Sequence, residues 1–149
     1  MASPIQFYSK ENAMNREDLY CAETGKSPAQ FACDFDKVAK KYGFVVNNSD
    51  TMDMAKTFRA HGAAAGEGFD LHMIQICKPE KASKSLAANP ERAILMPKFV
   101  MAFSKGGRTQ LRFMSFSAAD VSAMVDDQVF PGSLAESFQK IRDMIDEAK

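Results

Sequence analysis

The sequence predicts an α+β fold, in which a mostly antiparallel sheet of about five strands has helices packed on one face. Five segments have strand character, near residues 19, 44, 70, 95 and 110. Two long amphipathic helical segments follow the first and the last of these strands. The last two strands are joined through Gly106 and Gly107, as is typical of a β-hairpin, and a hairpin excludes an all-parallel sheet.

Length and composition indicate one globular domain. Of the 149 residues, 46% are apolar and 26% are charged, which is close to the average of soluble proteins. We expect a polar N-terminal arm over residues 1–17, which has no hydrophobic period, and a single α+β domain over residues 18–149.

The charge balance and the N-terminal sequence bear on partners and location. The 19 basic and 19 acidic residues cancel, so the composition favours neither nucleic-acid nor membrane-surface binding. The longest apolar run, Phe99 to Phe103, is too short to cross a bilayer. The N-terminus lacks a secretory signal, which predicts a soluble, cytoplasmic protein. A periplasmic chain whose signal peptide had been removed would have the same features.

The first half of the domain is expected to alternate strands with helices. A strand starts at Leu19 and stops at Gly25, after which Ser27 and Pro28 begin a helix as N-cap and first helical residue. The apolar stripe of this helix is Phe31, Phe35, Val38 and Tyr42. The elements expected next are a strand at Phe44–Val46, a short helix at Met54–Phe58, a strand at Phe69–Cys77, two helical turns at Lys81–Ala88 and a strand from Ile94.

The register of the hairpin can be inferred from its alternating faces. A two-residue loop at Gly106-Gly107 would pair Met101 with Arg112 and so place an apolar side chain opposite a charged one. A three-residue loop from Lys105 to Gly107 pairs Met101 with Leu111, and we expect this register. One face of the sheet would then carry both basic and apolar side chains, namely Lys98, Val100, Ala102, Gln110, Arg112 and Met114.

The chain is expected to end in a long amphipathic helix. Ser117 and Asp120 begin a short helical stretch, and Pro131-Gly132 then forms a break. Ser133 and Glu136 have the spacing of a capping box. The helix that follows has apolar residues at steps of four, three and four: Leu134, Phe138, Ile141 and Ile145.

Several short motifs occur in a characteristic order: Gln75-Ile76-Cys77-Lys78-Pro79, Leu86, Asn89-Pro90, Leu95-Met96-Pro97 and the Gly106-Gly107 hairpin. In these motifs the chain resembles the bacterial and archaeal family called domain of unknown function 302, over roughly residues 18–148. The resemblance implies a β-α-β4-α sandwich related to TATA-binding-protein-like folds, often a homodimer, and no established activity. Many relatives have Pro-Cys where this chain has Pro97-Lys98, so a thiol pair is not carried over.

No spacing typical of a nucleophilic triad or a metal site is readable, so we assign no catalytic residue, no metal ligand and no cofactor. Cys77 follows a strand and precedes Lys78 and Lys81, which could favour a thiolate. An unpaired cysteine is equally typical of a small buried apolar residue. The ten methionines could bind copper(I), but several lie in apolar runs with phenylalanines, as in a core or an interface.

The segment from Lys78 to Arg112 has eight basic residues and two acidic ones. In the expected register Lys98 and Arg112 are diagonal neighbours, about 7 to 8 Å apart at their backbones, with Met114 opposite Lys98. Their side chains could converge on a phosphate, sulfate or carboxylate. Asp70 or an acidic residue near the C-terminus could fill the same role internally.

These features predict a small binding domain that is non-enzymatic or only weakly catalytic. It would take a small anionic or amphipathic ligand, or an acidic protein partner, on its sheet face through Lys98, Arg112, Met114 and Cys77. An apolar strip of Val100, Ala102 and Met114, with no second helix layer to cover it, predicts a homodimer. The alternative is a thiol or soft-metal protein that uses Cys77 and methionines to bind copper.

Overall fold

The computed structural model describes residues 18–149, and the arm expected over residues 1–17 lies outside the described residues. The strands are β1 (Leu19–Thr24), β2 (Val45–Val46), β3 (Leu71–Cys77), β4 (Lys98–Lys105) and β5 (Arg108–Met114). The helices are α3 (Pro28–Lys41), α4 (Met54–Ala60), α5 (Pro79–Ala88), the 3-10 helix η1 (Pro90–Leu95), α6 (Ala118–Met124) and α7 (Phe130–Ala148).

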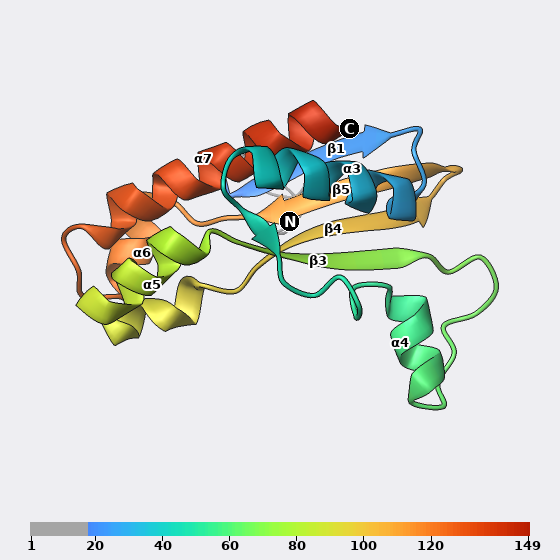
Figure 1. The fold of residues 1–149 in the computed structure, drawn as a ribbon, viewed down its shortest axis with the longest axis horizontal. Helices are drawn as coiled ribbons and strands as arrows, with labels where there is room; N and C mark the ends of the chain where they lie inside the picture. Colours follow the sequence, from blue (N-terminus) through green and yellow to red (C-terminus); the bar gives the residue numbers. More distant parts are fainter. Residues whose placement is uncertain (1–17) are drawn as a thin grey trace, which may run out of the picture.

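The five strands form one sheet in the order β1-β5-β4-β3-β2, and all neighbours are antiparallel. Figure 1 shows α3 and α7 side by side along the sheet, with α5 and α6 gathered at one of its ends. The predicted α+β class, with an antiparallel sheet and helices on one face, is therefore confirmed.

The two long helices bury the apolar stripes that predicted them. Phe31 and Phe35 of α3 are fully buried and stack with ring centroids 5.6 Å apart. Phe138 of α7 is buried edge-on against Phe113 of β5, at 5.9 Å. The hydroxyl of Ser27 accepts a hydrogen bond from the backbone N–H of Gln30, so the predicted N-cap of α3 is confirmed. Apolar burial of this kind, at about 1.5 to 3 kcal/mol for each large side chain, holds the two layers together.

The predicted register of the hairpin is wrong by one residue. β4 and β5 are joined by the two-residue loop Gly106-Gly107, so that Met101 lies opposite Arg112 and Val100 lies opposite Phe113. Both glycines have positive φ angles, of 64° and 76°. A two-residue turn of this kind needs positive φ at both central positions, which glycine adopts without strain.

In the observed register, the side chains of β4 that were expected to face away from the helices face toward them, and the other side chains face away. Val100 and Ala102 are fully buried beneath the helices, so they do not form the exposed apolar strip expected for a dimer. Lys98 shares their alternation and lies opposite Ile76 of β3, not opposite Met114. Arg112 alternates with the buried Leu111 and Phe113 and therefore points to the other side of the sheet. Lys98 and Arg112 thus belong to opposite faces by strand alternation, although both of them line one groove at the start of β4, together with Met114.

The region before β4 and the start of α7 also differ from expectation. The strand expected from Ile94 begins at Lys98, because residues 90–95 form η1. The break expected at Pro131-Gly132 falls within the first turn of α7, where proline costs no hydrogen bond. The carboxylate of Asp127 caps this helix by accepting the N–H groups of Val129 and Phe130, at 2.9 and 2.8 Å, so Ser133 is not the cap.

Candidate functional site

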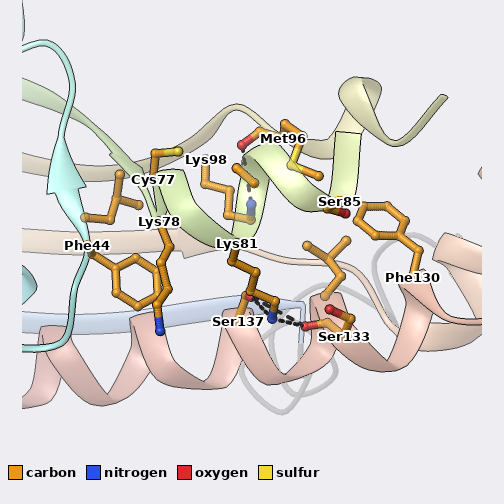
Figure 2. A pocket seen from close by; sticks show the side chains of 13 residues that line it. Phe44, Cys77, Lys78, Lys81, Ser85, Met96, Lys98, Phe130, Ser133 and Ser137 are labelled. Atoms are coloured by element: carbon orange, nitrogen blue, oxygen red, sulfur yellow. Dashed lines mark hydrogen bonds between the residues drawn. The ribbon is translucent and has the colours of Figure 1, made fainter. Parts of the chain in front are cut away.

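A cavity opens between the end of β3, the start of β4 and helices α5 and α7 (Figure 2). Its apolar lining is Phe44, Ile76, Ala82, Met96, Phe130 and Leu134. Its polar lining is Cys77, Lys78, Lys81, Ser85, Lys98, Ser133 and Ser137. Three lysines and three serines therefore surround an apolar floor.

The apolar floor belongs to the core of the domain. Phe44, Ile76, Phe130 and Leu134 are all buried and join the main hydrophobic cluster. Because packed core side chains hold fixed positions, they give the cavity a shape that does not depend on flexible surface groups. A ligand in this cavity would contact carbon on one side and the lysine and serine groups on the other.

Lys81 reaches from α5 to α7 across the cavity. Its Nζ donates to the backbone carbonyl of Ser133 at 2.9 Å and to the hydroxyl of Ser137 at 2.7 Å, as the dashed lines in Figure 2 indicate. Burial lowers the pKa of the Lys81 ammonium, and Lys78 lowers it further, against the opposing effect of Glu136. Two good hydrogen bonds thus hold Lys81 in place as a positive charge on the cavity wall.

Lys98 enters the same cavity from the first residue of β4. Its Nζ makes one long contact, 3.4 Å, to the carbonyl of Met96. Burial lowers the pKa of the Lys98 ammonium; the nearby Cys77 partly opposes this effect, and Lys81 adds to it. Lys98 is therefore a mostly buried ammonium with weak internal solvation, a state that an incoming anion would relieve.

Cys77 and Lys78 complete the cavity on the side of β2. The thiol of Cys77 is half-buried at the end of β3, near Lys98 (Figure 2). The ammonium of Lys78 lies 5.5 Å from the ring centroid of Phe44, within the range of a cation–π contact. Among the described residues, no carboxylate lines this cavity beside its three lysines, although Glu136 lies close enough to raise the pKa of Lys81.

The far end of the cavity is fixed by a buried ion pair. Arg92 of η1 binds Asp127 through Nε at 2.7 Å and through Nη2 at 3.0 Å, and the Arg92 and Asp127 side chains are only 11% and 6% exposed. Arg92 also donates to the hydroxyl of Ser85 at 3.0 Å and lies 5.4 Å from the Phe130 ring centroid. Because Ser85 and Phe130 line the cavity, this pair sets the spacing of its walls.

The other two predicted site residues, Arg112 and Met114, lie on the opposite side of the sheet. We call this side the outer face; its main side chains are Leu71, Met73, Phe99, Met101, Phe103, Arg112 and Met114. Two shallow grooves on it meet at Met101 and Arg112. Met114 is 63% exposed, whereas most of these side chains are half-buried.

Arg112 has neutral partners in the described part of the chain. Its Nη1 donates to the carbonyls of Leu111 and Ala22, at 2.9 and 3.3 Å, and its guanidinium lies 5.6 Å from the ring centroid of Phe103. The internal partner considered for it, Asp70, lies instead beside His72, with Oδ1 and Nδ1 3.6 Å apart.

Lys98 connects the four predicted site residues: it lines the cavity together with Cys77, and it lines a groove of the outer face together with Arg112 and Met114. The sequence reasoning missed Ser133 and Ser137 as cavity residues, because it placed a helix cap at Ser133. The four-residue spacing of the two serines, which places them on one side of a helix, is the signal that would have paired them.

Residues 18–149 contain no group of three histidine, cysteine, aspartate or glutamate side chains arranged to hold a metal ion. Every helix in the same range is too short or too polar to cross a membrane.

Comparison with known proteins identifies the family. A family model described as domain of unknown function DUF302 matches residues 20–148. The crystal structure of an uncharacterized conserved protein DUF302 from Bacillus stearothermophilus is similar, with a TM-score of 0.72 and 13% identity over 90% of this chain and 100% of that chain. No curated protein matches the sequence. Because the family model spans nearly the whole sequence, this chain belongs to the DUF302 family.

Proposed function

We propose that this protein is a binding domain for a small organic anion, which it takes in the cavity between β3, β4, α5 and α7. The observation that carries the proposal is the set of three ammonium groups, of Lys78, Lys81 and Lys98, around one cavity without a lining carboxylate among the described residues. Buried or half-buried like charges repel one another unless an anion lies between them.

The chemistry of the lining indicates the class of ligand. Lys81, Lys98 and the hydroxyl of Ser137 offer donors to carboxylate or phosphate oxygens, and charge-assisted hydrogen bonds of this kind are the stronger ones. The floor of Phe44 and Phe130 offers carbon to an alkyl or aromatic group. The enclosed space is about 30 Å³, so it admits the anionic group of such a ligand, an amphipathic carboxylate or phosphate ester, whose larger apolar part would remain at the cavity mouth.

The proposal can be tested by thermal unfolding in the presence of benzoate, hexanoate, phenyl phosphate and inorganic phosphate at constant ionic strength. A ligand at a hundred times its dissociation constant stabilises a protein by about 2.7 kcal/mol, which raises Tm by roughly 5 to 10 °C for a chain of this size. We expect the amphipathic anions to stabilise the wild-type protein, benzyl alcohol to have no effect, and Lys98→Met and Lys81→Met each to remove most of the shift.

Lys84→Met is the matched control, because Lys84 is in the same helix as Lys81 but is 77% exposed and outside the cavity. It should keep the full anion-dependent shift. Equal shifts in all four proteins would mean that the anions act elsewhere, and the proposal would then be wrong.

A soft-metal function is the second candidate, because the sulfur atoms of Cys77 and Met96 line this same cavity. Three ammonium groups beside them oppose a bound cation, and the geometry therefore favours the anion. A copper(I) titration of the wild type and Cys77→Ser separates the two: stabilisation by copper(I) that requires Cys77, without any anion effect, would support the metal function.

The outer face supports a separate proposal about assembly, namely that two copies of this chain associate through it. Its methionine, phenylalanine and arginine side chains are the residue types enriched in protein interfaces. The sequence predicted an interface centred on Val100 and Ala102, but both are buried. Met101 and Arg112, which lie opposite each other on the outer face, would be at the centre of the interface instead.

A further inference from the structure

The two grooves of the outer face have room for an apolar ligand. Their volumes are about 420 and 530 Å³, whereas the cavity between β3, β4, α5 and α7 has about 30 Å³. Sites for small molecules usually have about 300 to 1,000 Å³. The two grooves share Met101 and Arg112, so they adjoin at the middle of the sheet.

The lining of both grooves is mainly carbon, and its residues include Leu71, Met73, Phe99, Met101 and Phe103. Ile94 and Met114, which are 71% and 63% exposed, line the groove beside η1. Large apolar side chains that gather on one exposed surface mark a binding surface. An alkyl chain lying in these grooves would remove water from all of them.

Arg112 is the only cation among residues 18–149 that lines both grooves. Its Nη1 donates to two backbone carbonyls, and its Nη2 makes a long contact, 3.4 Å, to Oε1 of Gln110. Within the same residues its Nε–H has no acceptor and no carboxylate pairs with it. Where the two grooves meet, the guanidinium therefore has donors left for the oxygens of a carboxylate.

The acidic side chains on this side of the sheet have other partners. Asp70 lines the groove beside β3, and its Oδ1 lies 3.6 Å from Nδ1 of His72. Glu23 of β1 forms an ion pair with Arg108, at 3.1 Å. Neither carboxylate neutralises Arg112.

The association of two copies through the outer face changes the surroundings of Arg112. In a symmetric dimer, a residue at the centre of the interface lies near its own copy. Two guanidinium groups would therefore approach each other where the interface excludes water, and like charges repel most strongly there. An anion beside each Arg112 would offset this repulsion.

We infer that two copies of this chain enclose an apolar monocarboxylate in the grooves of each outer face, with its carboxylate on Arg112. The inference rests on the proposed association, because an open groove covers only one side of a ligand, whereas ligand sites commonly bury about 70 to 90% of the ligand surface. The guanidinium binds both carboxylate oxygens, and the alkyl chain lies along Met101 and Phe103. The second copy covers the exposed side of the chain.

Sedimentation velocity in the presence of decanoate at constant ionic strength tests this inference. Decanoate is expected to lower the dissociation constant of the wild-type dimer at least about tenfold, because ligand and second copy strengthen each other's binding. Butyrate lacks the long chain, and decyltrimethylammonium has the chain with a positive charge. Both should leave the dissociation constant unchanged.

Three variants make the result specific. Arg112→Gln should lose the effect of decanoate, and without decanoate it should associate at least as tightly as the wild type, because the repulsion is gone. Arg108→Gln is the matched control, since Arg108 is in the same strand but outside both grooves. It should respond to decanoate as the wild type does, and so should Asp70→Asn.

The outcomes separate the ligand from the dimer. A wild-type dimer that decanoate leaves unchanged would overturn the enclosed carboxylate and keep the proposed association. A protein that is monomeric with and without decanoate would overturn both. Dissociation of the dimer by decanoate would show that the ligand displaces the second copy, which contradicts the inference.

Two further results would assign the charges differently. Loss of association in both Arg112→Gln and Asp70→Asn would pair Arg112 with Asp70 of the partner subunit and leave no place for the ligand. An effect of decanoate that Arg112→Gln keeps and Lys81→Met loses would place the anion in the cavity between β3, β4, α5 and α7. Either result would overturn the inference.

Discussion

Lys98 illustrates how one side chain can oppose stability and support binding. Its ammonium lies in a cavity with an apolar floor and makes only a long contact to Met96. Burying a charge without strong partners costs free energy, and sites that bind ligands commonly retain such costs. The residue therefore lowers stability in the absence of a ligand, and an anion bound beside it would reduce this cost.

Lys98→Met is expected to raise Tm at neutral pH in the absence of anions, because methionine fills similar space without a charge. Burial lowers the pKa of Lys98 in the folded state, so the unfolded state holds its proton more firmly. The stability of the wild type should thus rise as the pH passes upward from that lowered pKa toward about 10.4, the unfolded value. The difference in Tm between Lys98→Met and the wild type should become smaller over the same pH range.

Thermal unfolding of both proteins from pH 7 to about pH 10 measures this difference. Lys84→Met provides the reference for loss of an exposed lysine. A Lys98→Met protein that is less stable than wild type at neutral pH would mean that the ammonium is better solvated than its contacts indicate.

Among the elements, the β4–β5 hairpin shows which features of the fold could be predicted from the sequence and which could not. The positions of the strands other than β4, the stripe of α3 and the cap at Ser27 follow from local patterns and were predicted correctly. The register was predicted wrongly, because Met101 was expected to avoid a charged partner, whereas it lies opposite Arg112. In the fold the Arg112 guanidinium lies over the ring of Phe103, so a long charged side chain shares an apolar face.

The error in register also explains the error in the site. A shift of one residue turns every side chain of a strand to the other face, so Lys98 and Arg112 are not diagonal neighbours on one face, although both line one groove. Two consecutive glycines were the better signal, since a turn with two positive φ angles needs them. The contribution of Ser133 and Ser137 depends on how α7 packs beside α5, which local patterns do not encode.

The start of α7 depends on Asp127, which joins helix capping to the buried ion pair. Its carboxylate accepts from the backbone of Val129 and Phe130 and from the side chains of Arg92 and Asn89. The bonds to Arg92 and then to Asn89 hold the pKa of Asp127 well below its ordinary value. The charged carboxylate thus stabilises both the helix and the end of the cavity.

Asp127→Asn should lower Tm at neutral pH, because it removes the charge that Arg92 faces. A carboxyl with a depressed pKa contributes stability above its unfolded value of about 3.9, and this contribution is lost as the pH falls below about 4. The wild type should therefore keep its advantage in Tm down to about pH 4 and lose it progressively at lower pH, toward the depressed pKa of the folded state. Circular dichroism melts at several pH values give the comparison.

Asp126→Asn is the matched control, since Asp126 is the exposed neighbour of Asp127. Its Tm should stay close to that of wild type throughout the same range. A constant difference between wild type and Asp127→Asn at every pH would contradict a role for the carboxylate charge.

At the scale of the whole molecule, the sheet has two unlike sides. One side is packed against α3 and α7, whereas the outer face has half-buried methionines and phenylalanines around Arg112. A specific dimer normally buries more than about 1,000 Å² in total, which requires a surface as broad as this sheet. Lys98 lines both the cavity and one groove of this face, so association through the outer face would bury surface next to the cavity.

Met101→Asp is expected to weaken self-association at least about tenfold, or about 1.4 kcal/mol, because it places a charge at the centre of the outer face. Sedimentation velocity from low to high micromolar concentrations measures the effect. Gln139→Asp, on the exposed side of α7, should leave association unchanged. A wild-type protein that stays monomeric at high micromolar concentration would rule out the dimer.

The strand order has a consequence for how the chain acquires its fold. β1 pairs with β5, so that Leu19 lies opposite Met114, whereas β3, β4 and β5 follow one another as neighbours. During synthesis, β1 and α3 leave the ribosome long before the strand that completes their side of the sheet exists. Phe31 and Phe35 therefore remain exposed until the second half of the chain has been synthesised and forms the surface that buries them. The nascent protein is thus most prone to aggregation in the interval between the first strand and the last.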